Sequence, residues 1–296
     1  MMIRALGAGA GGGLPQWNCN CTQCAAARRG DIPPMMQSSV AVSDDGAHWV
    51  VLNAAPDIRQ QLAATPALHP PELRGSPIRA VVLTNADVDH VAGLLTLREK
   101  TAFTLFATKS VLDVIRADRI FGVLDPALVS MVPIALDTPF SPLPNLQITP
   151  FAVPGKVALY LEGDGPVESG LVGEHTIGLA IAQGRHTFTY VPGCAALPDD
   201  LVARLSQSDL LFFDGTVWQD AELQKSGVGT KTGGRMGHIP MDGPEGSLTR
   251  LSSLTARRVY IHINNTNPVL LPDSRERRIV QAQGWELAFD GMEFEL

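Results

Sequence analysis

Short apolar runs, separated by glycine, proline and other turn residues, recur along the whole chain. Runs that are rich in β-branched residues or that alternate between apolar and polar positions predict strands, and apolar positions three or four residues apart predict helices. The predicted strands span residues 3–6, 39–43, 48–53, 78–83, 103–107, 146–153, 176–182, 187–191, 210–214 and 259–263. The predicted helices span residues 90–100, 109–117 and 274–283.

Turn residues join several of these strands into hairpins. Asp45-Gly46 separates the second and third strands, and Gly184-Arg185 separates the seventh and eighth. Paired strands interleaved with helices predict an α/β fold, an αββα four-layer sandwich in which two mixed β-sheets pack face to face and are flanked by helices. The proline-rich segment 68–77 is interpreted as a surface loop and not as a linker, so we expect residues 1–296 to form a single domain.

The composition narrows the class of partner. The chain has 296 residues, of which 45% are hydrophobic, and a net charge of −7. No stripe of Lys and Arg is available to replace the counterions of a nucleic acid, which favours a small molecule or a peptide as the partner. The N-terminal segment has no apolar region of signal-peptide type, and no run of about 18 apolar residues is present to cross a membrane. We therefore expect a cytoplasmic protein without membrane contact; a homodimer is compatible with the sequence.

Three of the four cysteines, Cys19, Cys21 and Cys24, lie close together in WNCNCTQC. Three thiols on one tight loop can converge on a tetrahedral Zn²⁺ ion, and three free thiols at this spacing would invite oxidation. We therefore predict a structural zinc site; the alternatives are a redox pair of Cys21 with Cys24, or cysteines without a metal. The fourth ligand must come from a distant segment. Cys194 in VPGCA is the chemical candidate, although a lone cysteine is more often a small buried apolar residue.

A second group of candidate ligands lies in TNADVDHVAG, directly after the predicted strand 78–83. Asp87, Asp89 and His90 stand between a strand end and a helix start, where side chains face a pocket and a helix N-terminus favours anions. A single aspartate in such a place is usually a helix cap. Three ligand-type side chains in four positions are a stronger indication of a site.

Two further histidines stand out. His262 lies in the polar ending HINNTNP of a buried strand, and His238 lies in the loop RMGHIPM. The alternative for each is a hydrogen-bonded core histidine. Asp89, His90 and His262 together offer two imidazoles and one carboxylate, the ligand set of mononuclear non-haem Fe(II) sites, which leave coordination positions open for O₂ and substrate.

Six long segments stand in a fixed order along the chain: GAGAGGGLPQWNCNCTQC, TNADVDHVAGLL, VPGKVALYLE, FDGTVW, MGHIP and HINNTNP. In this order they resemble one branch of the metallo-β-lactamase fold superfamily, the pyrroloquinoline quinone biosynthesis protein B family, over nearly the full length. The resemblance implies the αββα fold of metallo-β-lactamase type. It also implies a part in making the redox cofactor pyrroloquinoline quinone (PQQ) from a Glu and a Tyr that are cross-linked within a precursor peptide.

The chain departs from the hydrolytic members of the superfamily, which hold two zinc ions with five histidines and a bridging aspartate. Asn85 and Asp87 stand where the first two histidines of the signature loop THxHxDHxxG would be. Gly155 and Lys156 stand where a further histidine is expected, and YVPGCA lacks the bridging aspartate. Ligands for one metal remain. Members of the resembled family are regarded as iron-dependent hydroxylases, which agrees with a single Fe(II).

The resulting hypothesis is that Fe(II), held by Asp89, His90 and His262, hydroxylates the tyrosine ring of the cross-linked Glu–Tyr compound with O₂. His238 is expected to be a proton donor or substrate ligand, and Asp87 a ligand or a group that orients a metal-bound histidine. Asp214 in FFDGT resembles a residue of another active-site loop of the fold and is a further catalytic candidate. The candidates for binding the substrate are Arg235, Lys231, Lys156 and Asn85.

Two matters stay open at the level of sequence. A phosphodiesterase of phosphonate breakdown has a similar CxCxxC loop, completed by a residue three positions after its last active-site histidine, which corresponds to Asn265 here. An amide oxygen is a poor zinc ligand, so the fourth ligand is Asn265 or Cys194. The alternatives to a hydroxylase are a non-catalytic carrier of PQQ or its precursor, and a zinc hydrolase of a precursor peptide.

Overall fold

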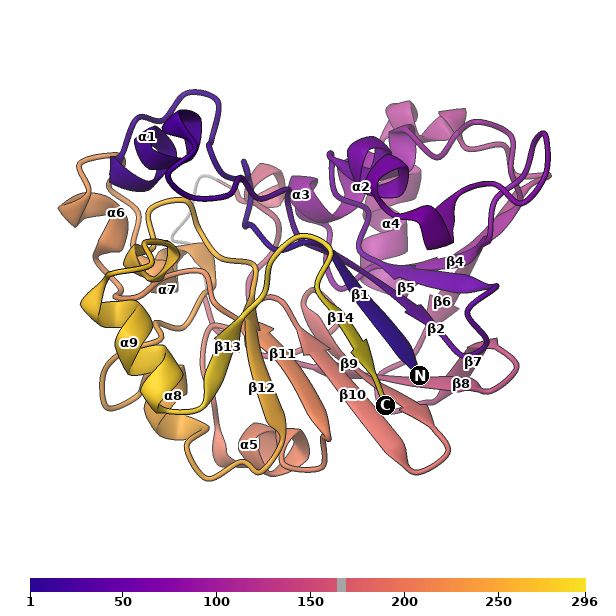
Figure 1. Cartoon of the computed structure of the whole chain (residues 1–296). Coiled ribbons are helices and arrows are strands. Elements are labelled where there is room, and N and C mark those ends of the chain that lie inside the picture. The colour runs from indigo at the N-terminus through magenta and orange to yellow at the C-terminus, as the bar shows by residue number, and fades with distance from the viewer. Residues whose placement is uncertain (164–168) are drawn as a thin grey trace.

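The computed structural model describes residues 1–163 and 169–296, and within them two seven-stranded sheets pack against each other (Figure 1). The first sheet has the order β14 (Glu293–Glu295), β1 (Met2–Gly7), β2 (Ser39–Ser43), β3 (Trp49–Leu52), β4 (Ile78–Val82), β5 (Phe103–Thr108), β6 (Val129–Ile134). The second has the order β13 (Trp285–Leu287), β12 (Arg257–Ile261), β11 (Leu210–Asp214), β10 (His186–Val191), β9 (Ile177–Gln183), β8 (Leu146–Ala152), β7 (Phe140–Leu143).

Both sheets are mixed. Strands β3 to β6 run parallel in the first sheet and β10 to β13 run parallel in the second, whereas the remaining neighbours are antiparallel. The carboxyl ends of the parallel strands are therefore available for a site in both sheets. Strands β1 and β14 pair, so that the two termini lie side by side (Figure 1).

Helices and 3₁₀ turns connect the strands and flank the sheets (Figure 1). The α-helices are α1 (Thr22–Arg29), α2 (Ile58–Ala64), α3 (Val88–Val91), α4 (Lys109–Ala117), α5 (Asp199–Leu205), α6 (Glu222–Lys225), α7 (Gly233–Met236), α8 (Ser247–Arg250) and α9 (Arg275–Ala282). The 3₁₀ turns are η1 (Pro66–Leu68), η2 (Ala92–Leu95), η3 (Arg119–Val123), η4 (Leu159–Leu161) and η5 (Pro268–Leu270). None of the helices in the described ranges is both long and apolar enough to span a bilayer.

The alternation of side chains along a strand explains the layers. In β3, Val50 and Leu52 belong to the buried cluster between the sheets, whereas Trp49 and Val51 belong to a second cluster that includes residues of α2 and α4. Successive side chains of a strand point to opposite faces, so a run that is apolar at every position is buried on both. The predicted αββα sandwich is confirmed.

The predicted helix over residues 90–100 is wrong in its extent. The helix α3 ends at Val91, and the short 3₁₀ turn η2 follows it. The N–H of Gly93 donates to the carbonyl of Ala54 (2.8 Å) instead of continuing the helix. A Cβ at Gly93 would lie 2.2 Å from the carbonyl oxygen of Ala55. The spacing of apolar residues along the sequence does not indicate such a contact with a distant segment.

The outermost strands of the two sheets, β6, β7, β13 and β14, are not predicted by the sequence pattern. Two of them contain a proline, Pro133 in β6 and Pro142 in β7. Proline cannot donate to a strand ladder and is tolerated at a sheet edge. Edge strands are short and partly exposed, so their apolar signal is weak.

Candidate functional site

The candidate metal ligands meet where parallel strands of both sheets end. The loop after β4 and the helix α3 carry Asp89 and His90, and His262 follows β12 directly. His262 has a φ of +59°, a left-handed conformation that a residue other than glycine seldom adopts. Such strain at a strand end is typical of a residue whose side chain must face a site.

Asp89, His90 and His262 converge on one point. Their ligand-type atoms lie within 4.8 Å of one another. Nε2 of His262 lies 3.0 Å from Oδ2 of Asp89, and Nε2 of His90 lies 4.0 Å from the same oxygen. Among the described residues, the buried Nε2 of His90 has no hydrogen-bond partner. A buried imidazole nitrogen without a partner, beside a carboxylate and a second imidazole, suits a bound metal ion.

Burial and charge set the protonation of these ligands. Burial lowers the pKa of His90 to about 4, so its imidazole is neutral near pH 7, as a metal ligand must be. Burial alone would raise the pKa of Asp89, but the adjacent imidazoles of His90 and His262 hold it below its usual range. For Asp87, burial and then the charge of Asp89 raise the pKa. Asp89 is thus the anionic ligand.

Asn85 does not line the cavity, in contrast to its predicted place beside the substrate. Its Oδ1 accepts a hydrogen bond from Nδ1 of His90 (2.6 Å), and its Nδ2 donates to Oδ2 of Asp87 (2.8 Å). The side chain is buried and holds the His90 ring in place. Asp87 itself does line the cavity, together with Asp89.

Asp214 is enclosed beneath the site. Its two oxygens accept hydrogen bonds from Nδ1 of His238 (2.7 Å), the N–H of Cys194 (2.9 Å), and both the N–H (3.0 Å) and hydroxyl (2.7 Å) of Thr216. The residue is fully buried, so it cannot contact a substrate directly and acts through its neighbours. His238 lies in the cavity wall, and although burial opposes its charge, Asp214 raises its pKa above the ordinary value.

The predicted substrate cations are not equivalent. Arg235 donates to both oxygens of Glu162 (3.0 and 2.7 Å), and Lys156 donates to one of them (3.0 Å). Hydrogen bonds from Arg235, and then from Lys156, lower the pKa of Glu162 to about 2. Lys231 lines the same cavity of about 260 Å³ and forms no ion pair within residues 1–163 and 169–296. Of the three cations, Lys231 is therefore the one not already paired with a described carboxylate.

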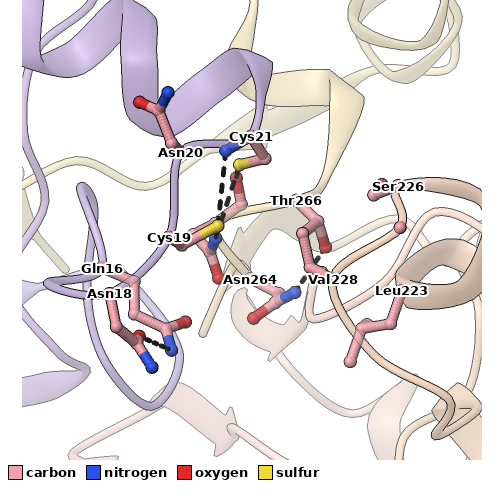
Figure 2. A pocket seen from close by; sticks show the side chains of 12 residues that line it. Gln16, Asn18, Cys19, Asn20, Cys21, Leu223, Ser226, Val228, Asn264 and Thr266 are labelled. Carbon is pink, nitrogen blue, oxygen red and sulfur yellow. Dashed lines mark hydrogen bonds between the residues drawn. The ribbon is translucent and has the colours of Figure 1, made fainter.

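The three clustered thiols form a second candidate metal site, of which Figure 2 shows Cys19 and Cys21. The sulfurs of Cys19, Cys21 and Cys24 lie within 4.8 Å of one another, and Nδ2 of Asn265 lies 3.3, 3.5 and 3.2 Å from them. Cys19 and Cys21 line a cavity, and Figure 2 shows their side chains among the others that line it. The volume of this cavity is about 500 Å³. Cys194 lies elsewhere, buried after β10 with its thiol donating to the carbonyl of Ala196 (3.0 Å). The geometry therefore brings Asn265, and not Cys194, to the thiols.

Burial also changes the pKa of the thiols. It raises the pKa of Cys21 to about 11. It opposes ionisation of Cys19 too, but hydrogen bonds, first from the backbone of Cys21, lower the pKa of Cys19 overall. A metal ion that binds all three must displace protons, as zinc does at thiolate sites.

Two residues of the site were absent from the sequence interpretation. Thr216 contacts both His238 and His262, and Glu162 pairs with two of the predicted cations. Thr216 lies in the FDGTVW segment, two residues after the end of a buried strand, but nothing in the sequence distinguishes it from its neighbours there. Glu162 lies at the end of the VPGKVALYLE segment, where one acidic residue carries no signal of its own.

The fold and the site agree with a known class of protein. A family model described as "Beta-lactamase superfamily domain" matches residues 48–263, which is most of the chain. The chain is therefore a member of the β-lactamase superfamily. A diphosphatase of the PhnP family has a TM-score of 0.69 with 21% identity, covering 100% of this chain and 97% of that one, which shows a shared fold alone.

Proteins with higher sequence identity to this chain show which family of the superfamily it belongs to. Coenzyme PQQ synthesis protein B of Ruegeria pomeroyi is 54% identical over 296 residues, and the protein of the same name from Methylorubrum extorquens is 52% identical over 300; each match covers 100% of both chains. The crystal structure of zinc-bound PqqB from Methylobacterium extorquens has a TM-score of 0.98 with 52% identity, again over 100% of both chains. The chain belongs to the coenzyme PQQ synthesis protein B family.

Proposed function

We propose that this protein is an Fe(II)- and O₂-dependent hydroxylase of PQQ biosynthesis that acts on the tyrosine ring of the cross-linked Glu–Tyr precursor. The proposal rests on the buried Nε2 of His90, which lies near Asp89 and His262 and has no hydrogen-bond partner among residues 1–163 and 169–296. Two imidazoles and one carboxylate are the ligand set of non-haem Fe(II) oxygenases. The names of the relatives support the part in PQQ synthesis.

The bound iron would supply activation of O₂: one oxygen atom enters a ring C–H bond, the other leaves as water, and an added reductant provides two electrons. The residues of the chain bind and orient the substrate. Leu159 and Met236 give the cavity an apolar lining that suits an aromatic ring, and Lys231 is placed to pair with a carboxylate of the substrate.

His238 is the proposed proton donor. Its Nδ1 is bonded to Asp214, so its other ring nitrogen is available on the cavity side. Burial opposes the charge of His238, but Asp214 raises its pKa, which favours the protonated imidazole that a general acid requires. Asp87 shares a hydrogen bond with Asn85, which in turn holds His90, and so it helps to orient that ligand.

A zinc hydrolase is the alternative that a specific observation favours, because the Methylobacterium extorquens relative is zinc-bound. Zinc also binds more tightly than Fe(II) to most sites of this type. A two-metal hydrolase would need further ligands. Asp214, His238 and His262 also lie within 4.8 Å of one another, but both oxygens of Asp214 are already used in hydrogen bonds. These contacts support one metal at this site.

The test is mass spectrometry of the cross-linked Glu–Tyr compound after incubation with Fe(II)-loaded protein, reductant and ¹⁸O₂. We expect ¹⁸O in the ring, no product with His262→Ala or Asp89→Ala, and full activity with His186→Ala, which changes a surface histidine. An unchanged compound that still binds the protein would indicate a carrier. Cleavage of a precursor peptide without iron and O₂ would indicate a hydrolase.

A further inference from the structure

Thr216 lies at the centre of a hydrogen-bond network that joins three of the candidate functional residues. Its Oγ1 lies 2.7 Å from Oδ1 of Asp214, 2.9 Å from Nδ1 of His262 and 3.1 Å from Nδ1 of His238. Oγ1 also lies 2.9 Å from the carbonyl oxygen of His262. The side chain is buried, so water does not substitute for these partners.

The direction of each hydrogen bond follows from counting donors. A threonine hydroxyl has one proton and two lone pairs. The carboxylate of Asp214 is the strongest acceptor within reach and is also the closest, so it receives that proton. The oxygen of Thr216 can then only accept from Nδ1 of His262. His262 must therefore carry a proton on Nδ1, so that in the metal-bound protein the lone pair of Nε2, which lies 3.0 Å from Oδ2 of Asp89, can bind the ion.

His90 is held by the same device. Its Nδ1 donates to Oδ1 of Asn85, and its Nε2, which lies 4.0 Å from Oδ2 of Asp89, has no hydrogen-bond partner in the described part of the chain. Two rings on different elements are thus each fixed at Nδ1 by a polar, uncharged side chain. A metal-bound histidine almost always donates its second ring N–H to a hydrogen-bond acceptor, which fixes the tautomer and the orientation of the ring.

We propose that Thr216 is a positioning residue for the metal: by accepting the Nδ1–H of His262 it fixes the tautomer in which Nε2 can bind the ion, and Asp214 fixes the direction of its hydroxyl. This inference rests on the metal site of the proposed function but not on the reaction carried out there. Without the hydroxyl, metal binding through Nε2 would leave the Nδ1–H of His262 buried and unpaired.

The test compares wild type and variants in the affinity of the active site for Zn²⁺. The affinity is measured by competition with a chelating dye after the thiol site has been filled. Thr216→Val keeps the shape but removes the hydroxyl, and we expect its affinity to fall about 10- to 100-fold. Thr216→Ser restores the hydroxyl and should bind within about threefold of wild type. Thr189→Val is the matched control, because it removes a buried threonine hydroxyl that contacts Ser208, away from the site.

A second measurement separates positioning from a general loss of structure. In ¹⁵N-labelled, zinc-loaded protein, NMR correlation of the imidazole nitrogens should show His262 protonated at Nδ1 in the wild type and in Thr216→Ser. Thr216→Val with wild-type zinc affinity, or a wild-type His262 protonated at Nε2, would overturn the inference alone. A wild type that binds no zinc beyond the thiol site would overturn the proposed function as well.

Discussion

Glu162 forms a two-point ion pair with Arg235, which lines the metal-site cavity, and both carboxylate oxygens accept hydrogen bonds from the guanidinium. Lys156 shares the same carboxylate. A single acidic side chain therefore neutralises two of the cations that the sequence assigned to substrate binding.

Removing that negative charge should strengthen the binding of an anionic substrate. Because the pKa of Glu162 is about 2, its carboxylate is charged at neutral pH, and Glu162→Gln frees the charge of Lys156 and Arg235. We expect KM for the cross-linked Glu–Tyr compound to fall roughly three- to tenfold at low salt. Steady-state kinetics with Glu99→Gln, an exposed acid on another surface, provides the control. A higher KM in Glu162→Gln would mean that the ion pair shapes the cavity instead.

Asp214→Asn should destabilise the fold as well as the site. Asp214 is fully buried and accepts four hydrogen bonds, and an amide presents donors where two of these contacts need an acceptor. We expect a loss of about 2–4 kcal/mol in the free energy of unfolding, measured with urea. Asp199→Asn, an exposed acid at the start of α5, should stay within about 0.5 kcal/mol of wild type.

Asp290 should give stability a distinctive pH dependence. It accepts backbone N–H bonds from Ala8 (3.1 Å) and Met36 (2.7 Å), but burial raises its pKa to about 6. The folded state then binds this proton more tightly than the unfolded state does. The contribution of Asp290 to the free energy of unfolding is therefore complete below about pH 4 and is lost as the pH rises through about 6.

The comparison with Asp290→Asn isolates this contribution from those of other carboxylates. The stability of wild type relative to the variant should decrease by about 2 kcal/mol between pH 4 and pH 7. Urea unfolding at a series of pH values measures this difference. A difference that is constant across the range, or that grows with pH, would contradict a raised pKa.

The thiol site can be tested by counting metal ions. Cys24→Ser should lower the zinc content by about one equivalent per chain and lower the melting temperature, because Cys24 is fully buried and its sulfur lies beside Asn265. Cys194→Ser should keep the full zinc content, since its thiol lies in another part of the fold. Loss of zinc in Cys194→Ser alone would instead favour Cys194 as a ligand.

Much of the fold could be predicted because the central strands are apolar on both faces and are bounded by turns. Strands β2, β9, β10, β11 and β12 lie close to their predicted ranges. The edge strands could not be predicted, because only pairing on one side and partial burial distinguish them from loops. The shortened helix after Asp89 depends on the contact of Gly93 with Ala54, which joins segments far apart in sequence.

The residues of the site also fall into those that could be predicted from the sequence and those that could not. Asp89, His90 and His262 carry chemistry that is visible in their residue types, and the structure brings them together. What sequence could not supply was the pairing of polar groups. Asn85 was expected to face the substrate and instead supports His90, and two of the expected substrate cations are already paired with Glu162. Such assignments depend on which donor reaches which acceptor across the fold.

His262 and Asn265 stand within four residues of each other, yet one faces the proposed iron site and the other contacts the three thiols. Both proposed metal centres therefore need the segment that follows β12. During synthesis the cysteines at positions 19 to 24 leave the ribosome long before this segment exists. Until residue 265 has emerged, the three thiols lack their contact with Asn265, and until β12 has joined its sheet, His262 cannot reach Asp89 and His90.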